Sequence, residues 1–117
     1  MPTTHPTIEE PKNRSVIDHI AIVVDDIDAS VDWYASRFDC DVRWHDASWA
    51  YLQFANCGLA LVVDGSHPSH FAVQVTGLSR FGQPLSHRDG TRFIYVNDHD
   101  GNVVEMLDRS AVSEASQ

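Results

Sequence analysis

The sequence predicts an α+β fold made of two tandem βαβββ modules, in which the helix of the second module is shortened. Three observations lead to this prediction. Residues 18–24 and 69–75 superpose histidine on histidine and apolar residue on apolar residue, 51 positions apart. A helix-length segment follows the first run, whereas only a short one follows the second. Near the end of the chain, Asp100-Gly101 stands between two apolar runs, which is typical of a β-hairpin.

The first module begins with a strand and a helix. Residues 15–24 are rich in Val and Ile without the spacing of a helical stripe, which indicates a largely buried strand. The segment Asp25-Asp26-Ile27-Asp28 then offers capping oxygens and negative charge that suit a helix N-terminus. Beyond it, five largely apolar residues recur at helical spacing, which predicts a helix of about three turns packed on the sheet. These residues are Ile27, Val31, Tyr34, Ala35 and Phe38.

The remaining elements are read from apolar runs and the turns between them. In the first module we expect strands at 41–45, 49–55 and 58–63, because short polar or Gly-containing segments separate them. The second module restarts with a strand at 70–75, and residues 76–83 leave room for a helical stub only. Its further strands are expected around 84–87, 92–96 and 102–107.

Glu105 is the unusual residue of the final hairpin. It stands in a run of apolar residues, Val103, Val104, Met106 and Leu107. A carboxylate at such a position must reach water, find a partner or bind a metal, because burying it unpaired is costly or forces it to be neutral.

Two histidines are candidate partners of Glu105. Strand alternation puts His19 and His70 on the faces of their strands opposite the main apolar sets. If the two modules curl toward each other, His19, His70 and Glu105 converge as a 2-His-1-carboxylate set, which suits Fe(II) and also accepts Zn, Ni, Co or Mn. Each residue also has a structural alternative: strand histidines are often satisfied within a sheet, and Glu105 could pair with Arg92 or Arg109.

Composition limits the partners. The 117 residues carry a formal charge of −9 and no basic run, which argues against nucleic acid and anionic membranes. The two cysteines, Cys40 and Cys57, are too far apart for a C-x-x-C site. We expect a cytoplasmic protein, because no apolar run approaches the ~18 residues of a membrane span and the N-terminus lacks a signal-peptide pattern. Residues 1–14 and 109–117 read as a flexible arm and a flexible tail.

Several motifs together resemble one family. They are Ile17-Asp18-His19-Ile20-Ala21-Ile22, Asp25-Asp26-Ile27 with Ser30 and Trp33-Tyr34, the restart at His70, and Tyr95 through Asp98-His99-Asp100-Gly101-Asn102 to Glu105. The chain resembles the vicinal oxygen chelate superfamily, which includes glyoxalase I, methylmalonyl-CoA epimerase, fosfomycin-resistance transferases, extradiol dioxygenases and bleomycin-resistance proteins. His99 departs from the pattern, since the family usually has proline there.

The resemblance implies one vicinal oxygen chelate domain over residues 15–108. Module 1 would cover about 15–64 and module 2 about 69–108, and their curved mixed sheet would surround a cleft. The metal-binding positions of the superfamily correspond to His19, His70 and Glu105, which would hold a divalent ion (Fe, Mn, Ni, Co or Zn).

The catalytic candidates are Tyr95 and Gln74. Tyr95 stands where extradiol enzymes place a substrate-binding tyrosine, and otherwise covers the core. Gln74 shares the strand face of His70 and is a polar cleft candidate. His87 either reaches the mouth of the cleft or is solvated.

One departure shapes the functional expectation. Several relatives supply a fourth ligand from the last strand of module 1, but residues 59–63 are all apolar. This resembles the three-ligand members more than glyoxalase I. The resemblance implies a metal-dependent enzyme that binds two neighbouring oxygens of a small substrate, with lyase, isomerase, transferase or dioxygenase chemistry open. The alternative is a metal-free protein that sequesters a ligand, as bleomycin-resistance proteins do.

We expect a homodimer, with the site within one chain or between two.

Overall fold

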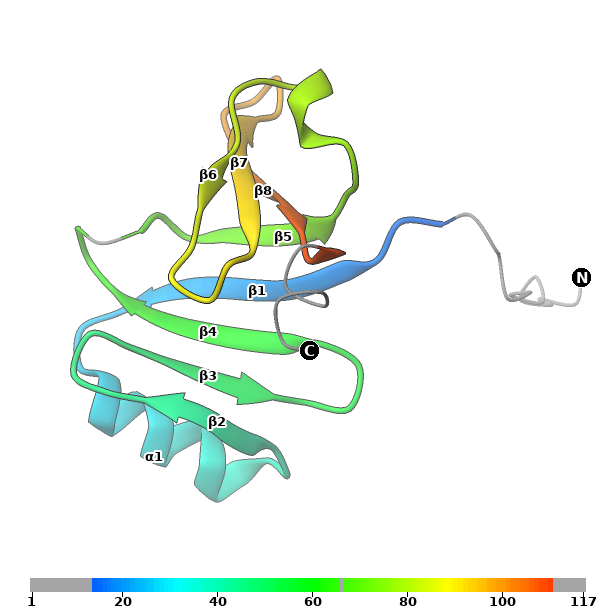
Figure 1. The fold of residues 1–117 in the computed structure, drawn as a ribbon. Coiled ribbons are helices and arrows are strands. Elements are labelled where there is room, and N and C mark those ends of the chain that lie inside the picture. The colour runs from blue at the N-terminus through cyan, green and yellow to red at the C-terminus, as the bar shows by residue number, and fades with distance from the viewer. Residues whose placement is uncertain (1–13, 66, 111–117) are drawn as a thin grey trace, which may run out of the picture.

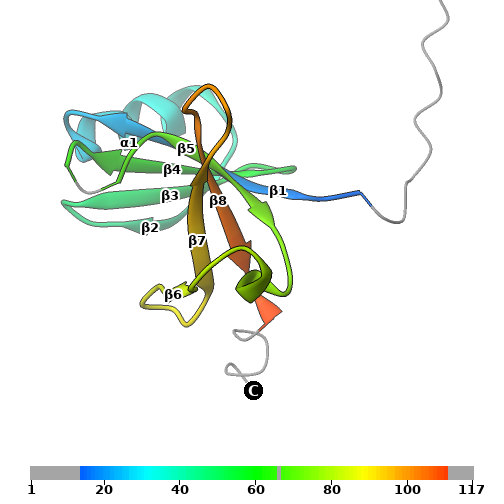
Figure 2. The same cartoon turned by 90° about the horizontal axis from the view of Figure 1, so that it is seen from above.

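The computed structural model describes residues 14–65 and 67–110. Over these residues the chain forms one eight-stranded mixed sheet with the strand order β2-β3-β4-β1-β5-β8-β7-β6 and one α-helix. The α+β fold of two modules expected from the sequence is confirmed. The sheet is curled rather than closed, and strands β7 and β8 run across the direction of β3 and β4 (Figures 1 and 2).

Module 1 contains the helix. Its elements are β1 (Ile17–Val24), α1 (Ile27–Arg37), β2 (Asp41–His45), β3 (Trp49–Gln53) and β4 (Gly58–Val63). Asp26 caps the helix, and its side chain accepts a hydrogen bond of 3.0 Å from the Ala29 N–H. The helix covers one face of the sheet of module 1, where its apolar stripe is buried against β3 and β4 (Figure 1). This core consists of Ile27, Val31, Ala50, Leu52 and Leu61. The opposite face is thereby left for the site.

Module 2 repeats the strands but has no equivalent of α1 among its described residues. Its elements are β5 (His70–Gln74), the 3-10 helix η1 (Leu78–Arg80), β6 (Leu85–Ser86), β7 (Arg92–Asn97) and β8 (Val103–Asp108). The expected helical stub is thus a single 3-10 turn. It contacts β7 and β8, and Leu78 is buried there.

The two modules meet at the antiparallel pair β1 and β5. β1 also pairs in parallel with β4, and β5 in parallel with β8, so the two halves have matching topology. The register sets Ala72 of β5 beside His19 of β1 on one side and beside Glu105 of β8 on the other. Three consecutive strands therefore bring the candidate ligands into one neighbourhood.

The β7–β8 turn and the chain ends complete the described part. Asp98 organises the turn, because its side chain accepts hydrogen bonds from the backbone N–H groups of Asp100 and Asn102. Gly101 has a φ of 87°, which favours glycine. Residues 1–13 and 111–117 of the expected arm and tail lie outside the described residues, whereas Arg109 is held by Asp18. No helix of residues 14–65 and 67–110 is long and apolar enough to cross a membrane.

Candidate metal centre

His19, His70 and Glu105 converge on one point of the sheet. The Nε2 atom of His19 lies 3.4 Å from Oε1 of Glu105, and that of His70 lies 3.1 Å from the same oxygen. One potential ligand atom from each residue lies within 4.8 Å of the other two. Glu105 is only 2% exposed. The residues of the 2-His-1-carboxylate set are therefore brought together, as expected from the sequence.

Both imidazoles are oriented through their other ring nitrogen. The Nδ1–H of His70 donates to the carbonyl oxygen of Pro68 at 2.7 Å, which leaves Nε2 directed at Glu105. His19 Nδ1 lies 2.7 Å from a carboxylate oxygen of Asp18, which directs its Nε2 to the same place. Metal-binding histidines usually have such a partner, because it fixes the tautomer and the ring orientation.

Asp18 reaches His19 because the strand is irregular there. Between Ile17 and His19 the β1–β5 register shifts, so Asp18 is the extra residue of a β-bulge. Strict alternation would send the Asp18 and His19 side chains to opposite faces, so the sequence did not indicate Asp18 as a partner of His19. Its carboxylate also accepts two hydrogen bonds from Arg109, at 2.6 and 2.9 Å, and one from Gln74 at 2.8 Å.

The charges of the cluster compensate one another. Burial by itself would raise the pKa of Glu105, but hydrogen bonds from His19, His70 and His87 outweigh it and hold that pKa well below the usual value. Burial likewise opposes protonation of His19, yet hydrogen bonds to Asp18 and Glu105 raise its pKa to about 9. The pKa of Asp18 is lowered, since hydrogen bonds from Arg109 and His19 outweigh its burial. Near neutral pH, His19 is thus an imidazolium between the carboxylates of Asp18 and Glu105.

A third histidine contacts the second oxygen of Glu105. His87, which follows β6, donates from Nε2 to Oε2 of Glu105 at 2.6 Å. Its ring is stacked on Phe93, with 3.8 Å between the centroids and 12° between the planes. The sequence places His87 before an Asp-Gly turn without indicating which way it faces, so this contact could not be recognised. It leaves Oε1 of Glu105 to the other two histidines.

The two catalytic candidates lie at different places. Tyr95 pairs with Glu105 in the β7–β8 register, and its ring lies 5.2 Å from that of His70. Its hydroxyl is 3.0 Å from Nδ1 of His67. Burial, followed by the charge of Glu105, raises the pKa of Tyr95, so the phenol remains a donor at neutral pH. Gln74 donates a hydrogen bond to the carboxylate of Asp18 and lies beside His19 through that contact.

The first module provides a small residue where the second provides Glu105. Ala72 pairs with Glu105, and its counterpart in module 1, Ala21, pairs with Ala60. Ala60 therefore occupies the position equivalent to Glu105 and has no donor atom. Two imidazole nitrogens and one carboxylate oxygen fit a divalent transition metal with open positions for a substrate.

Comparisons with known proteins agree with this architecture. Residues 16–77 match the family model of the Glyoxalase/Bleomycin resistance protein/Dioxygenase superfamily. No curated protein matches the sequence.

Solved structures share the fold at low sequence identity. Methylmalonyl-CoA epimerase from Mycobacterium tuberculosis is 16% identical with a TM-score of 0.69, over 87% of this chain and 92% of that one. Hypothetical protein BH1468 from Bacillus halodurans C-125 is 15% identical with a TM-score of 0.66, over 82% and 95%. A superfamily member from Vibrio splendidus 12B01 is 11% identical with a TM-score of 0.58, over 81% and 98%. The chain belongs to the Glyoxalase/Bleomycin resistance protein/Dioxygenase superfamily.

Proposed function

We propose that the protein is a small metal-dependent enzyme that binds two neighbouring oxygens of a small-molecule substrate at His19, His70 and Glu105. The observation that carries this proposal is the orientation of the two imidazoles. Pro68 and Asp18 occupy their Nδ1 atoms, and both Nε2 atoms face one oxygen of a buried carboxylate. The family also supports a small-molecule substrate.

The side chains around the centre have distinct proposed roles. A divalent ion bound there would act as a Lewis acid on the substrate oxygens. Asp18 and Pro68 hold the imidazoles, and His87 holds the free oxygen of Glu105, so that these groups need little rearrangement on binding. Tyr95, which is beside His70 and keeps its proton at neutral pH, donates a hydrogen bond to the substrate. Lyase, isomerase, transferase and dioxygenase chemistry are all compatible with these roles.

Metal titration tests the proposal. The protein, dialysed free of metal, is titrated by calorimetry with Mn²⁺, Co²⁺, Ni²⁺ and Zn²⁺, and with Fe²⁺ under nitrogen. We expect one ion per chain for the wild type and none for Glu105→Gln, whose fold is verified by circular dichroism. Wild-type protein that binds none of the five metals would refute the metal-dependent function.

A second function has one observation in its favour. Both oxygens of Glu105 are satisfied by histidines without a metal, and the described residues contain no buried side-chain polar atom that lacks a partner. This is compatible with a metal-free protein that sequesters a ligand, like the bleomycin-resistance members. A ligand that binds wild type and Glu105→Gln equally, in the presence of chelator, would favour this function.

We also propose that the chain forms a homodimer. Ile20 and Phe71 are paired across β1 and β5, and both are exposed. This apolar surface suits a second copy. Sedimentation of Phe71→Lys is expected to give monomer, whereas the control Phe81→Lys, at another exposed aromatic residue, remains dimeric.

A cytoplasmic location stays a prediction from the sequence.

A further inference from the structure

A hollow lies next to the candidate metal centre. Its volume is about 460 Å³, and its wall includes Asp18 and Tyr51, both of which contact His19. The polar groups around it come from distant parts of the chain: Arg43, Gln53, Asn56, Gln74 and Arg109. We call this hollow the arginine pocket. It borders the centre and contains none of the three proposed ligands.

Two irregularities in the sheet direct charged residues to the arginine pocket. One is the bulge in β1 that turns Asp18 toward it. The other is in the edge strand β2, where the pairing shifts between Val42 and Trp44, so Arg43 is the extra residue. Bulges often re-aim side chains beside functional sites. Here two bulges place charged side chains in the wall of the same hollow, which indicates that the hollow is a specific feature of the fold.

The arginine pocket is positively charged in a strongly acidic chain. It has two guanidinium groups against the single carboxylate of Asp18, although the protein has 17 acidic and only eight basic residues. Arg109 is held by Asp18. Arg43 has Asp41 as its one ion-pair partner in the described part of the chain, at 3.8 Å, and such an exposed pair contributes little. Arg43 is therefore available to a ligand.

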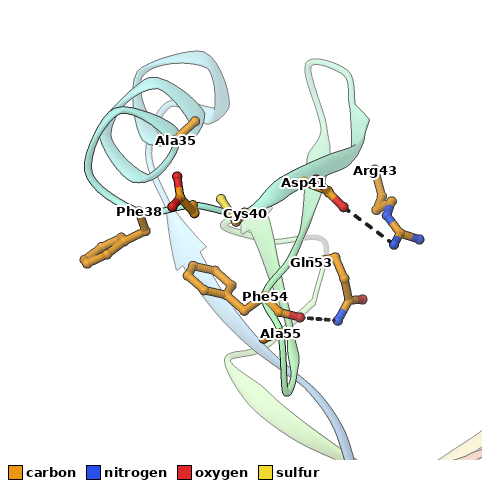
Figure 3. Close-up of a pocket in the computed structure, with 9 residues that line it drawn as sticks. Ala35, Phe38, Cys40, Asp41, Arg43, Gln53, Phe54 and Ala55 are labelled. Carbon is orange, nitrogen blue, oxygen red and sulfur yellow. Dashed lines mark hydrogen bonds and ion pairs between the residues drawn. The ribbon is translucent and has the colours of Figure 1, made fainter.

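A neighbouring hollow provides a contrast. It has a volume of about 730 Å³ and lies between α1 and the strands, with Phe38 at one side and Arg43 and Gln53 at the other (Figure 3). Its lining includes Asp39 and Asp41, so two carboxylates stand against the one guanidinium of Arg43. Of the two hollows, the arginine pocket is the one that favours an anion.

Tyr51 connects the arginine pocket to the metal centre. Its ring lies 5.8 Å from that of His19, and its hydroxyl lies over Gly58, where a Cβ atom would be only 1.9 Å away. A side chain at position 58 would thus push Tyr51 out of its place between the two sites. Tyr51 is thus a wall of the arginine pocket on one side and a neighbour of the proposed ligand His19 on the other.

We infer that the arginine pocket binds the anionic end, a carboxylate or a phosphate, of the same small substrate whose paired oxygens bind at His19, His70 and Glu105. Arginine recognises both groups through the fork of its guanidinium N–H donors. This inference rests on the proposed function for the second half of the substrate, but the binding of an anion to the pocket can be tested without a metal.

The test uses succinate and inorganic phosphate as probes. Each is titrated into ¹⁵N-labelled, metal-free protein at constant ionic strength, and amide shifts are followed for wild type, Arg43→Gln, Glu105→Gln and a control, Arg92→Gln. Arg92 is exposed on β7, so its replacement removes the same charge at another site. We expect saturable shifts at Gln53, Asn56 and Gln74 in wild type, Glu105→Gln and Arg92→Gln. Arg43→Gln should bind about tenfold more weakly. The probe that binds more tightly identifies the anionic group.

The inference of an anion site can be refuted independently of the proposed metal-dependent function. Shifts centred on His70 and Glu105, equal binding by Arg43→Gln and Arg92→Gln, or no saturable shift with either probe would overturn the inference. Metal titration of Arg43→Gln should give the wild-type affinity. If the wild type binds no metal but the arginine pocket still binds the probe, the metal-dependent function fails and the anion site stands.

Discussion

Asp18 and His19 are adjacent in the sequence, yet both side chains lie on the same side of the sheet, with Nδ1 of His19 at 2.7 Å from Oδ2 of Asp18. The bulge in β1 makes this possible. Through this contact, the pairing of Asp18 with Arg109 is connected to the orientation of the proposed metal ligand. The contact therefore links the end of β8 to the candidate metal centre.

Replacing Asp18 by Asn is expected to weaken metal binding. The variant keeps the size of the side chain but removes the charge that orients His19. Loss of such a partner typically lowers metal affinity by about 10–100-fold. Calorimetric titration measures the change. Asp28→Asn, on the exposed face of α1, serves as the control and should bind like wild type. Equal affinities for the two variants would contradict the role of Asp18.

Two replacements of His87 separate its hydrogen bond from its stacking. His87→Phe keeps a ring against Phe93 but cannot donate to Glu105, whereas His87→Gln keeps a donor and loses the ring. If the hydrogen bond positions Glu105, metal affinity falls by about tenfold or more in His87→Phe and is largely retained in His87→Gln. Metal titration and urea unfolding are measured on both. The opposite order of affinities would mean that stacking is what matters.

The place of Tyr51 depends on the missing side chain at position 58. A Cβ atom there would collide with the Tyr51 hydroxyl, so Gly58→Ala should lower the free energy of unfolding by about 1–3 kcal/mol. In a Tyr51→Ala background the space is open, and the same replacement should cost little. A double-mutant cycle by urea denaturation gives the coupling. Costs that simply add would show that Tyr51 does not fill this space.

Stability of the metal-free protein should depend on pH through His19 and Glu105. The pKa of His19 is raised from 6.5 to about 9, so its contribution is complete below pH 6.5 and is lost as pH rises to about 9. The pKa of Glu105 is lowered from 4.5, so its contribution is present above that pH and lost in acid. Together they stabilise most between pH 4.5 and 6.5.

The comparison of melting temperatures between wild type and His19→Asn isolates this effect. Other titrating groups are common to both proteins and largely cancel. The advantage of the wild type is expected to shrink between pH 6.5 and 9. An advantage that stays constant or grows over this range would contradict the protonated state of His19.

The strands and the helix were predictable because their signals are local. Apolar runs and capping residues are read from a few neighbouring positions, and the observed bounds differ from the expected ones by one or two residues, as in β3, which ends at Gln53 instead of Ala55. The repeat beginning at His19 and His70 predicted the matching modules. The pairing of β1 with β5 joins distant segments and does not follow from local pattern.

The site was predictable only where strands alternate regularly. His19, His70 and Glu105 follow from alternation and resemblance, and the structure brings them together. Asp18, which contacts His19, and Arg43, which lines the arginine pocket, stand at bulges that local sequence does not reveal, and neither position was predicted. His87 depends on how the β6–β7 turn folds back onto Glu105. Gln74 shares the strand face of His70 as expected, but its partner is Asp18.

The most direct measurement is elemental analysis of the protein purified without chelator or affinity tag, beside His19→Ala and Glu105→Gln. We expect close to one Fe, Mn, Ni, Co or Zn per chain in the wild type and none in either variant, with the fold of each variant verified by circular dichroism. The identity of the metal would then separate oxygen chemistry from Lewis-acid chemistry. Wild-type protein without metal that cannot be loaded, or variants that keep the full amount, would contradict the assignment of His19, His70 and Glu105 as ligands.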